Sequence, residues 1–413
     1  MAYDVARIRS WFPALEHGWA LFDGPGGTQT PRRVGEAVAS TLTGPLSNRG
    51  GLGESAQRAD DAVAAYRAAI ADLTGADPRG VVHGRSATQL AYDVSRTLAR
   101  TWGPGDEVVV TRLDHDANVR PWVQAAERAG AKVRWASFDA ATGELPVESV
   151  ASVLGERTRL VAVTAASNLI GTMPDVPAIA AAAHAAGALV AVDAVHLAAH
   201  ALPDLDALGA DLLLCSPYKF LGPHCGVLVA DPTWLESVDS DKLLPATEVV
   251  PERFEYGTLP YELLAGVTAA VEVLASLYDG VADGRAGEPA PATRRERLAA
   301  SYAALHDHES RLLARLEAGL GELPGVRVHS RAARRTPTLL ATFAGHDAAA
   351  VSSVLAEDRV LAPSGNFYAL EASRHLGLGD AGGLRVGLAP YTDDQDVERL
   401  LAGLRRAVGA AAA

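Results

Sequence analysis

The 413-residue sequence contains only two cysteines, Cys215 and Cys225. They are too few for a disulfide framework and lack the spacing of a metal site, so no metal is expected and a reducing compartment, the cytoplasm, is predicted. No apolar stretch reaches about 18 residues, so no membrane span is expected. The N-terminus lacks a basic segment followed by an apolar run, so no signal peptide is expected either.

Positive charge is also scarce. There are 37 Lys and Arg residues against 50 Asp and Glu residues, which gives a net charge of −13. A chain this acidic is not expected to bind nucleic acid, which is itself a polyanion. Hydrophobic residues make up 48% of the sequence, enough to bury a sizeable core.

Short apolar runs alternate with helical segments through the first two thirds of the chain. Strands are expected at residues 81–84, 107–111, 132–136, 158–164, 188–192, 211–215 and 226–229. Strand–helix alternation at this spacing predicts an α/β fold with a mostly parallel sheet covered by helices on both faces.

The C-terminal third has a different pattern, in which shorter strands alternate with helices and indicate a small α+β domain. A stretch rich in Gly, Pro and Ala, residues 284–293, is the best linker candidate. We therefore expect an N-terminal arm that packs on the small domain (1–20), a large domain (21–283) and a small C-terminal domain (284–413).

Two neighbouring strands lead into residues of opposite charge. Residues 188–192 run into Asp193, and residues 211–215 lead to Ser216 and Lys219. In an open α/β sheet, ligands bind at the edge that the C-terminal ends of the strands form. A lysine amine there can form a Schiff base with the aldehyde of pyridoxal phosphate (PLP), and an acid can keep the pyridine nitrogen protonated. From this stretch alone, a structural salt bridge is an equally good interpretation.

Two further segments have features of phosphate sites. Residues 23–28 (DGPGGT) form a glycine-rich loop without the P-loop pattern, which is equally typical of a plain turn that lets the chain approach a ligand. Residues 86–88 (SAT) open a helix that is expected to run to about residue 100. Such a helix start either binds an anion or is simply capped by its serine.

Taken in order and spacing, these motifs resemble those of the class V aminotransferase and cysteine desulfurase family of fold-type I PLP enzymes. The resemblance runs from about Leu21 to Leu404 and is closest to the cysteine desulfurase-like branch. It implies a large domain with a mostly parallel seven-stranded sheet between helices, a small C-terminal α+β domain, PLP as the cofactor, a small α-amino acid as substrate and a homodimer with shared active sites.

The resemblance assigns roles to individual residues. Lys219 is implied to be the Schiff-base lysine, and Asp193 to pair with the pyridinium nitrogen. The residues implied to contact the phosphate are Ser86, Ala87, Thr88, Ser216 and, reaching the neighbouring subunit, Thr258.

Three more positions match family residues at the cofactor ring and the substrate. His115 is implied to lie over the ring, where it could also pass protons, and Asn168 to contact the ring hydroxyl or the substrate. Arg385 is implied to hold the substrate carboxylate, because a guanidinium binds a planar carboxylate with two hydrogen bonds. Taken alone, His115 is equally typical of a surface turn. For Arg385, a surface position at a strand start is the less favoured alternative.

The sequence departs from the family pattern at three points. His196 replaces the usual Gln; both side chains can donate to the ring oxygen of the cofactor, but an imidazole titrates near neutral pH. Tyr218 precedes the lysine where a His is common. Residues 362–369 lack the persulfide cysteine of the desulfurases, so Asn366 or Tyr368 is expected to line the substrate pocket instead.

The predicted function is that of a PLP-dependent, cysteine desulfurase-like lyase that cleaves C–S or another β-substituent without the usual persulfide cysteine. Its expected catalytic residues are Lys219, His115 and Asp193. A class V aminotransferase or an epimerase remains an alternative, and so does a non-catalytic fold relative, against which the intact Lys219 and Asp193 argue. Cys215 is expected in the core, and Cys225, close behind Lys219, is expected to have a packing role.

Overall fold

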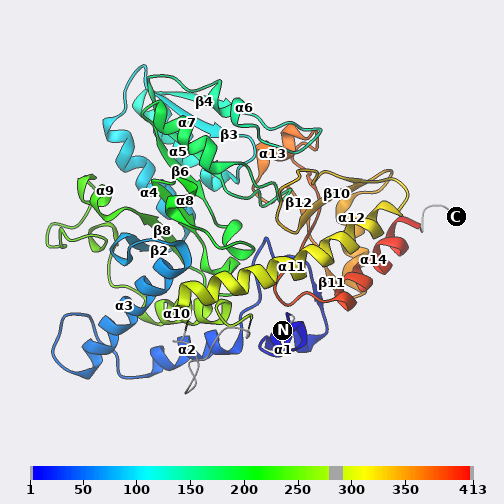
Figure 1. Cartoon of the computed structure of the whole chain (residues 1–413), viewed down its shortest axis with the longest axis horizontal. Coiled ribbons are helices and arrows are strands. Elements are labelled where there is room, and N and C mark those ends of the chain that lie inside the picture. Colours follow the sequence, from blue (N-terminus) through cyan, green and yellow to red (C-terminus); the bar gives the residue numbers. More distant parts are fainter. Residues whose placement is uncertain (1–2, 279–291, 410–413) are drawn as a thin grey trace.

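The computed structural model describes residues 3–278 and 292–409. Figure 1 shows a large α/β part and a smaller C-terminal part, with the long helix α11 (Arg294–Gly321) running from one to the other. The expected linker at 284–293 lies almost wholly outside the described residues.

The large part is built on a seven-stranded sheet with the order β2-β8-β7-β6-β5-β3-β4. Its strands are β2 Val81–Gly84, β3 Glu107–Thr111, β4 Lys132–Ala136, β5 Thr158–Thr164, β6 Leu189–Asp193, β7 Leu212–Cys215 and β8 Gly226–Ala230. Only the pairs that involve β8 are antiparallel. The prediction of a mostly parallel seven-stranded sheet is therefore confirmed.

Helices cover both faces of this sheet because its strands are apolar on both sides. On β5, Val161 and Val163 pack into one hydrophobic cluster, while Leu160 and Ala162 pack into the other. The first cluster also takes residues of α3 (Glu54–Thr74), α7 (Val176–Ala185) and α10 (Tyr261–Leu274). The second takes residues of α4 (Ala87–Leu98) and α5 (Arg120–Ala129).

The smaller part has a four-stranded antiparallel sheet with the order β12-β13-β10-β9. Its strands are β9 Val326–Val328, β10 Thr338–Phe343, β12 Ser364–Gly365 and β13 Gly383–Gly387, and its helices include α12 Ala348–Glu357 and α14 Asp394–Gly409. This is the small α+β unit expected from the sequence. The remaining α-helices are α1 Val5–Arg9, α2 Arg32–Thr43, α6 Val147–Ala151, α8 Leu205–Leu208, α9 Pro232–Ser237 and α13 Leu370–His375.

The N-terminal segment contacts both parts. Strand β1 (Ala20–Leu21) pairs in parallel with β11 (Val360–Leu361) of the smaller part. The Arg9 guanidinium bonds to the Asp396 carboxylate at 2.6 Å, whereas Phe12 packs into the core of the large part. The domain limits at residues 20 and 283 remain predictions. Within the described ranges, no helix is both long and apolar enough to span a membrane.

The first residue of β8 fixes how closely the sheet approaches α4. A Cβ on Gly226 would lie 2.1 Å from the carbonyl carbon of Ser86 and 2.4 Å from the amide nitrogen of Ala87. Because backbone cannot move aside easily, we expect Gly226→Ala to lower the free energy of unfolding by about 1–3 kcal/mol. Urea unfolding of the full chain measures this change.

Gly35 offers the matched control. It lies on the exposed side of α2. Apart from its chain neighbours and the backbone of its own helix, no atom lies within 4 Å of the place that a Cβ would take. Gly35→Ala should therefore raise the free energy of unfolding by about 0.5–1 kcal/mol, since alanine favours a helix interior. Equal stability of the two variants would contradict the close packing of β8 on α4.

Candidate functional site

The parallel pairing of β6 with β7 brings their C-terminal ends together. Asp193 is the last residue of β6 and pairs in register with Leu214. After β7, a short 3-10 turn (Pro217–Lys219) turns the chain back over the sheet edge. Asp193 and Lys219 thus line one cavity that opens to solvent.

This cavity gathers most of the residues singled out in the sequence. Its lining consists of Pro25, Ala87, Thr88, His115, Ala117, Thr164, Ala166, Asn168, Asp193, Val195, His196, Leu214, Ser216, Tyr218 and Lys219. The predicted site residues outside this lining are Ser86, Thr258, Arg385, Asn366 and Tyr368.

The amine of Lys219 is held by the glycine-rich loop. Its Nζ donates hydrogen bonds to the carbonyl oxygens of Pro25 and Gly26, the latter at 2.8 Å. Carbonyl oxygens repel a phosphate, so this loop acts as the plain turn of the two alternatives. Burial lowers the pKa of Lys219 to about 8, because a buried ammonium loses its hydration.

The carboxylate of Asp193 lies in a buried position and accepts a hydrogen bond from the N–H of Val195 at 2.8 Å. Loss of water around it raises the pKa of Asp193 to about 6, which the N–H of Val195 and the nearby Lys219 oppose. A cation placed against this carboxylate would therefore restore its charged form.

His115 has a defined orientation and tautomer. Its Nδ1 accepts the N–H of Ala117 at 3.0 Å, so the proton of a neutral ring sits on Nε2. Burial lowers the pKa of His115 to about 4, with further repulsion from Lys219 and Arg385. The interpretation of His115 as a surface turn residue does not fit this position.

The loop that carries His115 is braced by a buried carboxyl group that the sequence did not single out as functional. Asp114 bonds to the hydroxyl of Thr111 and to the side-chain amide of Asn118, the second at 2.7 Å. The indole of Trp122 donates to the oxygen of that amide at 3.1 Å. Burial raises the pKa of Asp114 to about 8. In the sequence, only the spacing of Thr111, Asp114 and Asn118 at the end of a strand could have indicated this buried network.

Two lining residues carry buried polar atoms that lack a hydrogen-bond partner among the described residues. They are Nδ1 of His196 and Oδ1 of Asn168. The other ring nitrogen of His196 lies 2.9 Å from the hydroxyl of Thr336 and 3.0 Å from that of Thr338. Buried orphan atoms at a cavity wall indicate a polar ligand that satisfies them.

The start of α4 shows the serine cap, and anion binding there remains a prediction. The side chain of Ser86 caps the helix by accepting the N–H of Gln89 at 3.1 Å. The next two residues, Ala87 and Thr88, line the cavity, as does Ser216 from the end of β7. Free N–H groups at a helix start favour an anion at this end of the cavity.

Arg385 lies behind Asn168 and is buried, so it is not a surface arginine. Its guanidinium donates to the Asp23 carboxylate at 2.7 Å and to the main-chain oxygen of Asn168 at 3.1 Å. It also stacks on the ring of Phe367 at 3.7 Å. The sequence did not predict these contacts of Asp23 and Phe367, although Asp23 opens the glycine-rich loop that was singled out.

In the segment that lacks the family cysteine, Tyr368 lines a surface depression that shares Thr88, His115, Ala117 and Tyr218 with the cavity. The ring of Tyr368 is 75% exposed and lies 5.7 Å from that of His115 between centroids. Asn366 is instead engaged by its own chain: its amide donates to the carbonyl of Asp380, beyond α13, at 2.8 Å, and its oxygen accepts the N–H of Tyr368. A substrate contact of Asn366 therefore remains a prediction.

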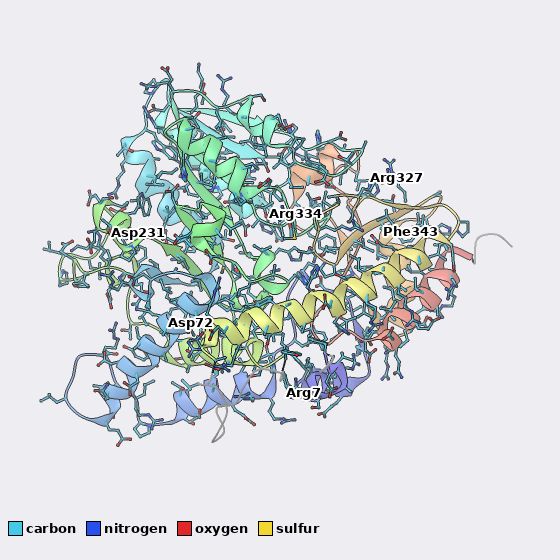
Figure 2. All side chains as sticks on the ribbon, in the orientation of Figure 1. Arg7, Asp72, Asp231, Arg327, Arg334 and Phe343 are labelled. Carbon is cyan, nitrogen blue, oxygen red and sulfur yellow. The ribbon has the colours of Figure 1, made fainter. Side chains whose placement is uncertain are left out.

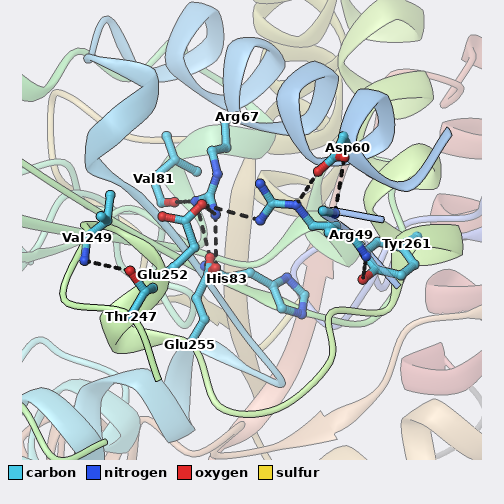
Figure 3. Close-up of polar contacts among 11 residues, drawn as sticks. Arg49, Asp60, Arg67, Val81, His83, Thr247, Val249, Glu252, Glu255 and Tyr261 are labelled. Carbon is cyan, nitrogen blue, oxygen red and sulfur yellow. Dashed lines mark hydrogen bonds and ion pairs between the residues drawn. The ribbon is translucent and has the colours of Figure 1, made fainter. Parts of the chain in front are cut away.

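Thr258 is exposed and lies in a separate surface depression with His83 and Tyr256. Figure 3 shows how the preceding segment is fixed: Glu252 and Glu255 bond to Arg67 of α3, the second at 2.9 Å. Thr258 thus stands away from the cavity of its own chain, and its contact with a neighbouring subunit remains a prediction.

A lysine and a buried carboxylate in one cavity, at the C-terminal edge of a doubly covered α/β sheet, define an enzyme site of the PLP type. The family model "Aminotransferase class-V" matches residues 20–282 and 297–400, and the chain belongs to this family. Members of the family depend on PLP. The orphan atoms, the helix start and the buried carboxylate described above fit that cofactor.

Individual relatives span the whole chain. It is 37% identical over 98% of its length to the uncharacterized protein MT3887 of Mycobacterium tuberculosis, covering 99% of that protein. It is 30% identical to a probable cysteine desulfurase of Pseudomonas aeruginosa, with 97% of each chain covered. The crystal structure of the Escherichia coli cysteine desulfurase CsdA superimposes with a TM-score of 0.85 at 27% identity, covering 99% of this chain and 100% of the other.

The raised pKa of Asp114 predicts a particular dependence of stability on pH. Between the unfolded value of about 3.9 and the folded value of about 8, the folded chain binds a proton that the unfolded chain has lost. The free energy of unfolding should therefore fall as the pH rises through this window. Asp114→Asn should remove that fall, since an amide does not titrate.

Denaturant unfolding at about pH 5 and pH 8 measures this effect, because both values lie inside the window. The exposed substitution Asp307→Asn serves as the control and should keep the wild-type slope. A wild-type slope in Asp114→Asn would show that the carboxyl group is already ionised in the fold.

Proposed function

We propose that this chain is a PLP-dependent enzyme that removes a β-substituent from a small α-amino acid, as a cysteine desulfurase-like lyase without a persulfide cysteine. The observation that carries the proposal is the cavity that contains the amine of Lys219 and the carboxylate of Asp193. Its fit to PLP and the family membership support the cofactor.

The choice of lysine is narrow, because the sequence contains only Lys132, Lys219 and Lys242. Lys132 is exposed on the edge strand β4, and Lys242 pairs with Glu248 at 2.8 Å. Lys219 alone combines a lowered pKa with a position in the cavity. It is therefore the residue that would hold the aldehyde.

The remaining lining residues would hold the rest of the cofactor. The N–H groups and hydroxyls at Ala87, Thr88 and Ser216 would bind the phosphate. Asp193 would face the ring nitrogen. Nδ1–H of His196 would donate to the ring oxygen, and Oδ1 of Asn168 would accept from the ring hydroxyl or from the substrate. PLP, when bound, supplies the electron sink that stabilises a negative charge at Cα.

The chain's own groups would then bind substrate and move protons. Nε of Arg385 is buried without a described partner and would donate to the substrate carboxylate. Lys219, with a pKa of about 8, would act as the general base at Cα near neutral pH. His115 would donate from Nε2 above the ring. The leaving group would take the Cβ bond pair, together with a proton from solvent or from His115.

No thiol is positioned to receive that leaving group. Residues 362–369 contain no cysteine, and Cys215 and Cys225 are both buried. Burial raises the pKa of Cys225 to about 12 and also raises that of Cys215, so neither is a thiolate near neutral pH. Direct release of the β-substituent is therefore favoured over a persulfide relay, and the two reduced thiols suit the cytoplasmic location predicted above.

We also propose a homodimer that shares its active sites, with Thr258 reaching the neighbouring phosphate. Leu52, Leu243 and Leu244 are 105%, 70% and 96% exposed, and Val249 and Tyr256 are also exposed. Apolar side chains in neighbouring segments before α3 and after α9 favour a protein–protein contact. Sedimentation of Leu243→Glu/Leu244→Glu tests this: a wild-type mass in the variant would contradict the proposal.

Borohydride reduction in the presence of PLP tests the attachment. We expect one phosphopyridoxyl group on the peptide that contains Lys219, because its neutral amine is the best nucleophile among the lysines. Lys219→Ala should lose both the label and the visible absorbance of bound PLP, and Lys242→Ala should keep both. A label that persists in Lys219→Ala would overturn the assignment.

Product analysis tests the reaction. With L-cysteine or β-chloroalanine, we expect pyruvate and ammonia, together with sulfide or chloride. Cys225→Ala should retain the wild-type rate, because the buried thiol is not needed. Amine transfer to a keto acid would instead establish an aminotransferase, Cα inversion without pyruvate would establish an epimerase, and loss of sulfide release in Cys225→Ala would restore the persulfide relay.

A further inference from the structure

Three ionisable side chains form a buried row behind the candidate active site. His196 lines the main cavity, and its ring lies 5.0 Å from that of His200 in an edge-to-face arrangement. Nδ1 of His200 lies 3.1 Å and 3.0 Å from the two carboxylate oxygens of Glu309 on α11. All three side chains are at most 5% exposed.

The far end of this row opens into a second cavity between the two parts of the chain. His200 and Glu309 line it together with His306 and Arg334, whose position is labelled in Figure 2. Thr336 lines it too, and its hydroxyl is the one that lies 2.9 Å from Nε2 of His196. One wall therefore separates the two cavities.

Glu309 gives the two imidazoles different surroundings, because its carboxylate lies against His200 and not against His196. A buried carboxylate needs a proton donor, and Nδ1–H of His200 is placed to be that donor. Two imidazolium rings at this separation would repel each other strongly. Within this row Glu309 is a counterion for His200 alone, and the ring that lines the main cavity has no carboxylate of its own there.

The other charged groups act in the same direction on His196. Its pKa is lowered by burial first and then by His200, Lys219 and Arg385. At the opposite end, the charge of Glu309 raises the pKa values of Tyr3 and Tyr302 and opposes the lowering of the pKa of His308. The second cavity adds His306, Arg334 and Arg335.

We propose that His200 and Glu309 are positioning residues that keep His196 neutral at the wall of the cofactor pocket and connect its protonation to the second cavity. This inference rests on the proposed function only in so far as His196 faces the cofactor. In this arrangement His196 is an uncharged hydrogen-bonding group where the ring oxygen of the cofactor would lie. Protons would reach His200 and Glu309 from the second cavity, on the side away from the substrate.

Nitrogen-15 NMR of the histidine-labelled full chain, prepared without PLP, tests this directly. The His196 signals are identified by their loss in His196→Gln. In the wild type we expect His196 to stay neutral from about pH 6 to pH 8. In His200→Asn and in Glu309→Gln its titration midpoint should rise by about one pH unit or more, because the competing cation is removed.

The controls separate this role from a purely structural one. His306→Asn and Arg334→Gln change the second cavity without touching the row, and should leave the His196 midpoint in place. His200→Asn/Glu309→Gln keeps a neutral hydrogen-bonded pair and should shift the midpoint no further than either single variant, since coupled sites are not additive. If a single variant with an unpaired buried group does not fold, the His196 midpoint of the double variant tests the proposal in its place.

An unchanged His196 midpoint in folded His200→Asn, Glu309→Gln or the double variant would overturn the proposal, and so would an equal shift in the controls. A second readout follows the absorbance of added PLP against pH, whose midpoint should move in the same variants and not in the controls. Failure to bind PLP would count against the proposed function alone, because the NMR titration does not need the cofactor.

Discussion

The site depends on the parallel pairing of β6 and β7. That register ends both strands at one sheet edge, so Asp193 and the turn that carries Lys219 face a single cavity. The main chain, rather than side-chain contacts, thus sets the separation of carboxylate and amine. The glycine-rich loop then completes the arrangement, because the carbonyls of Pro25 and Gly26 hold the amine in place.

Burial provides most of the chemistry at this edge. The same loss of water lowers the pKa values of Lys219 and His115 and raises that of Asp193. An amine that is partly neutral and a carboxylate that requires a cation are complementary to an aldehyde and a ring nitrogen. Behind the wall that His196 forms, a second buried contact joins His200 to the carboxylate of Glu309.

The sequence predicted the architecture well because its strands are short apolar runs that end in polar residues. It also located the cavity, since one strand ends in Asp193 and its neighbour leads into the turn that carries Lys219. It could not show that Asp23 pairs with Arg385, or that Glu309 pairs with His200, because these partners lie 362 and 109 positions apart. Nor could it show that Asn366 donates to the carbonyl of Asp380, since these two residues lie 14 positions apart on either side of α13.

Helix α11 joins two hydrophobic cores without a break. Leu298 and Leu305 belong to the core of the large part, and Leu312 and Leu316 to that of the smaller part. Glu309 stands between these two sets, at the point where the helix passes from one core to the other. Any tilting of the smaller part about this crossing would move the carboxylate of Glu309. Closure of the chain around a bound molecule would thereby change the surroundings of His200 and His196.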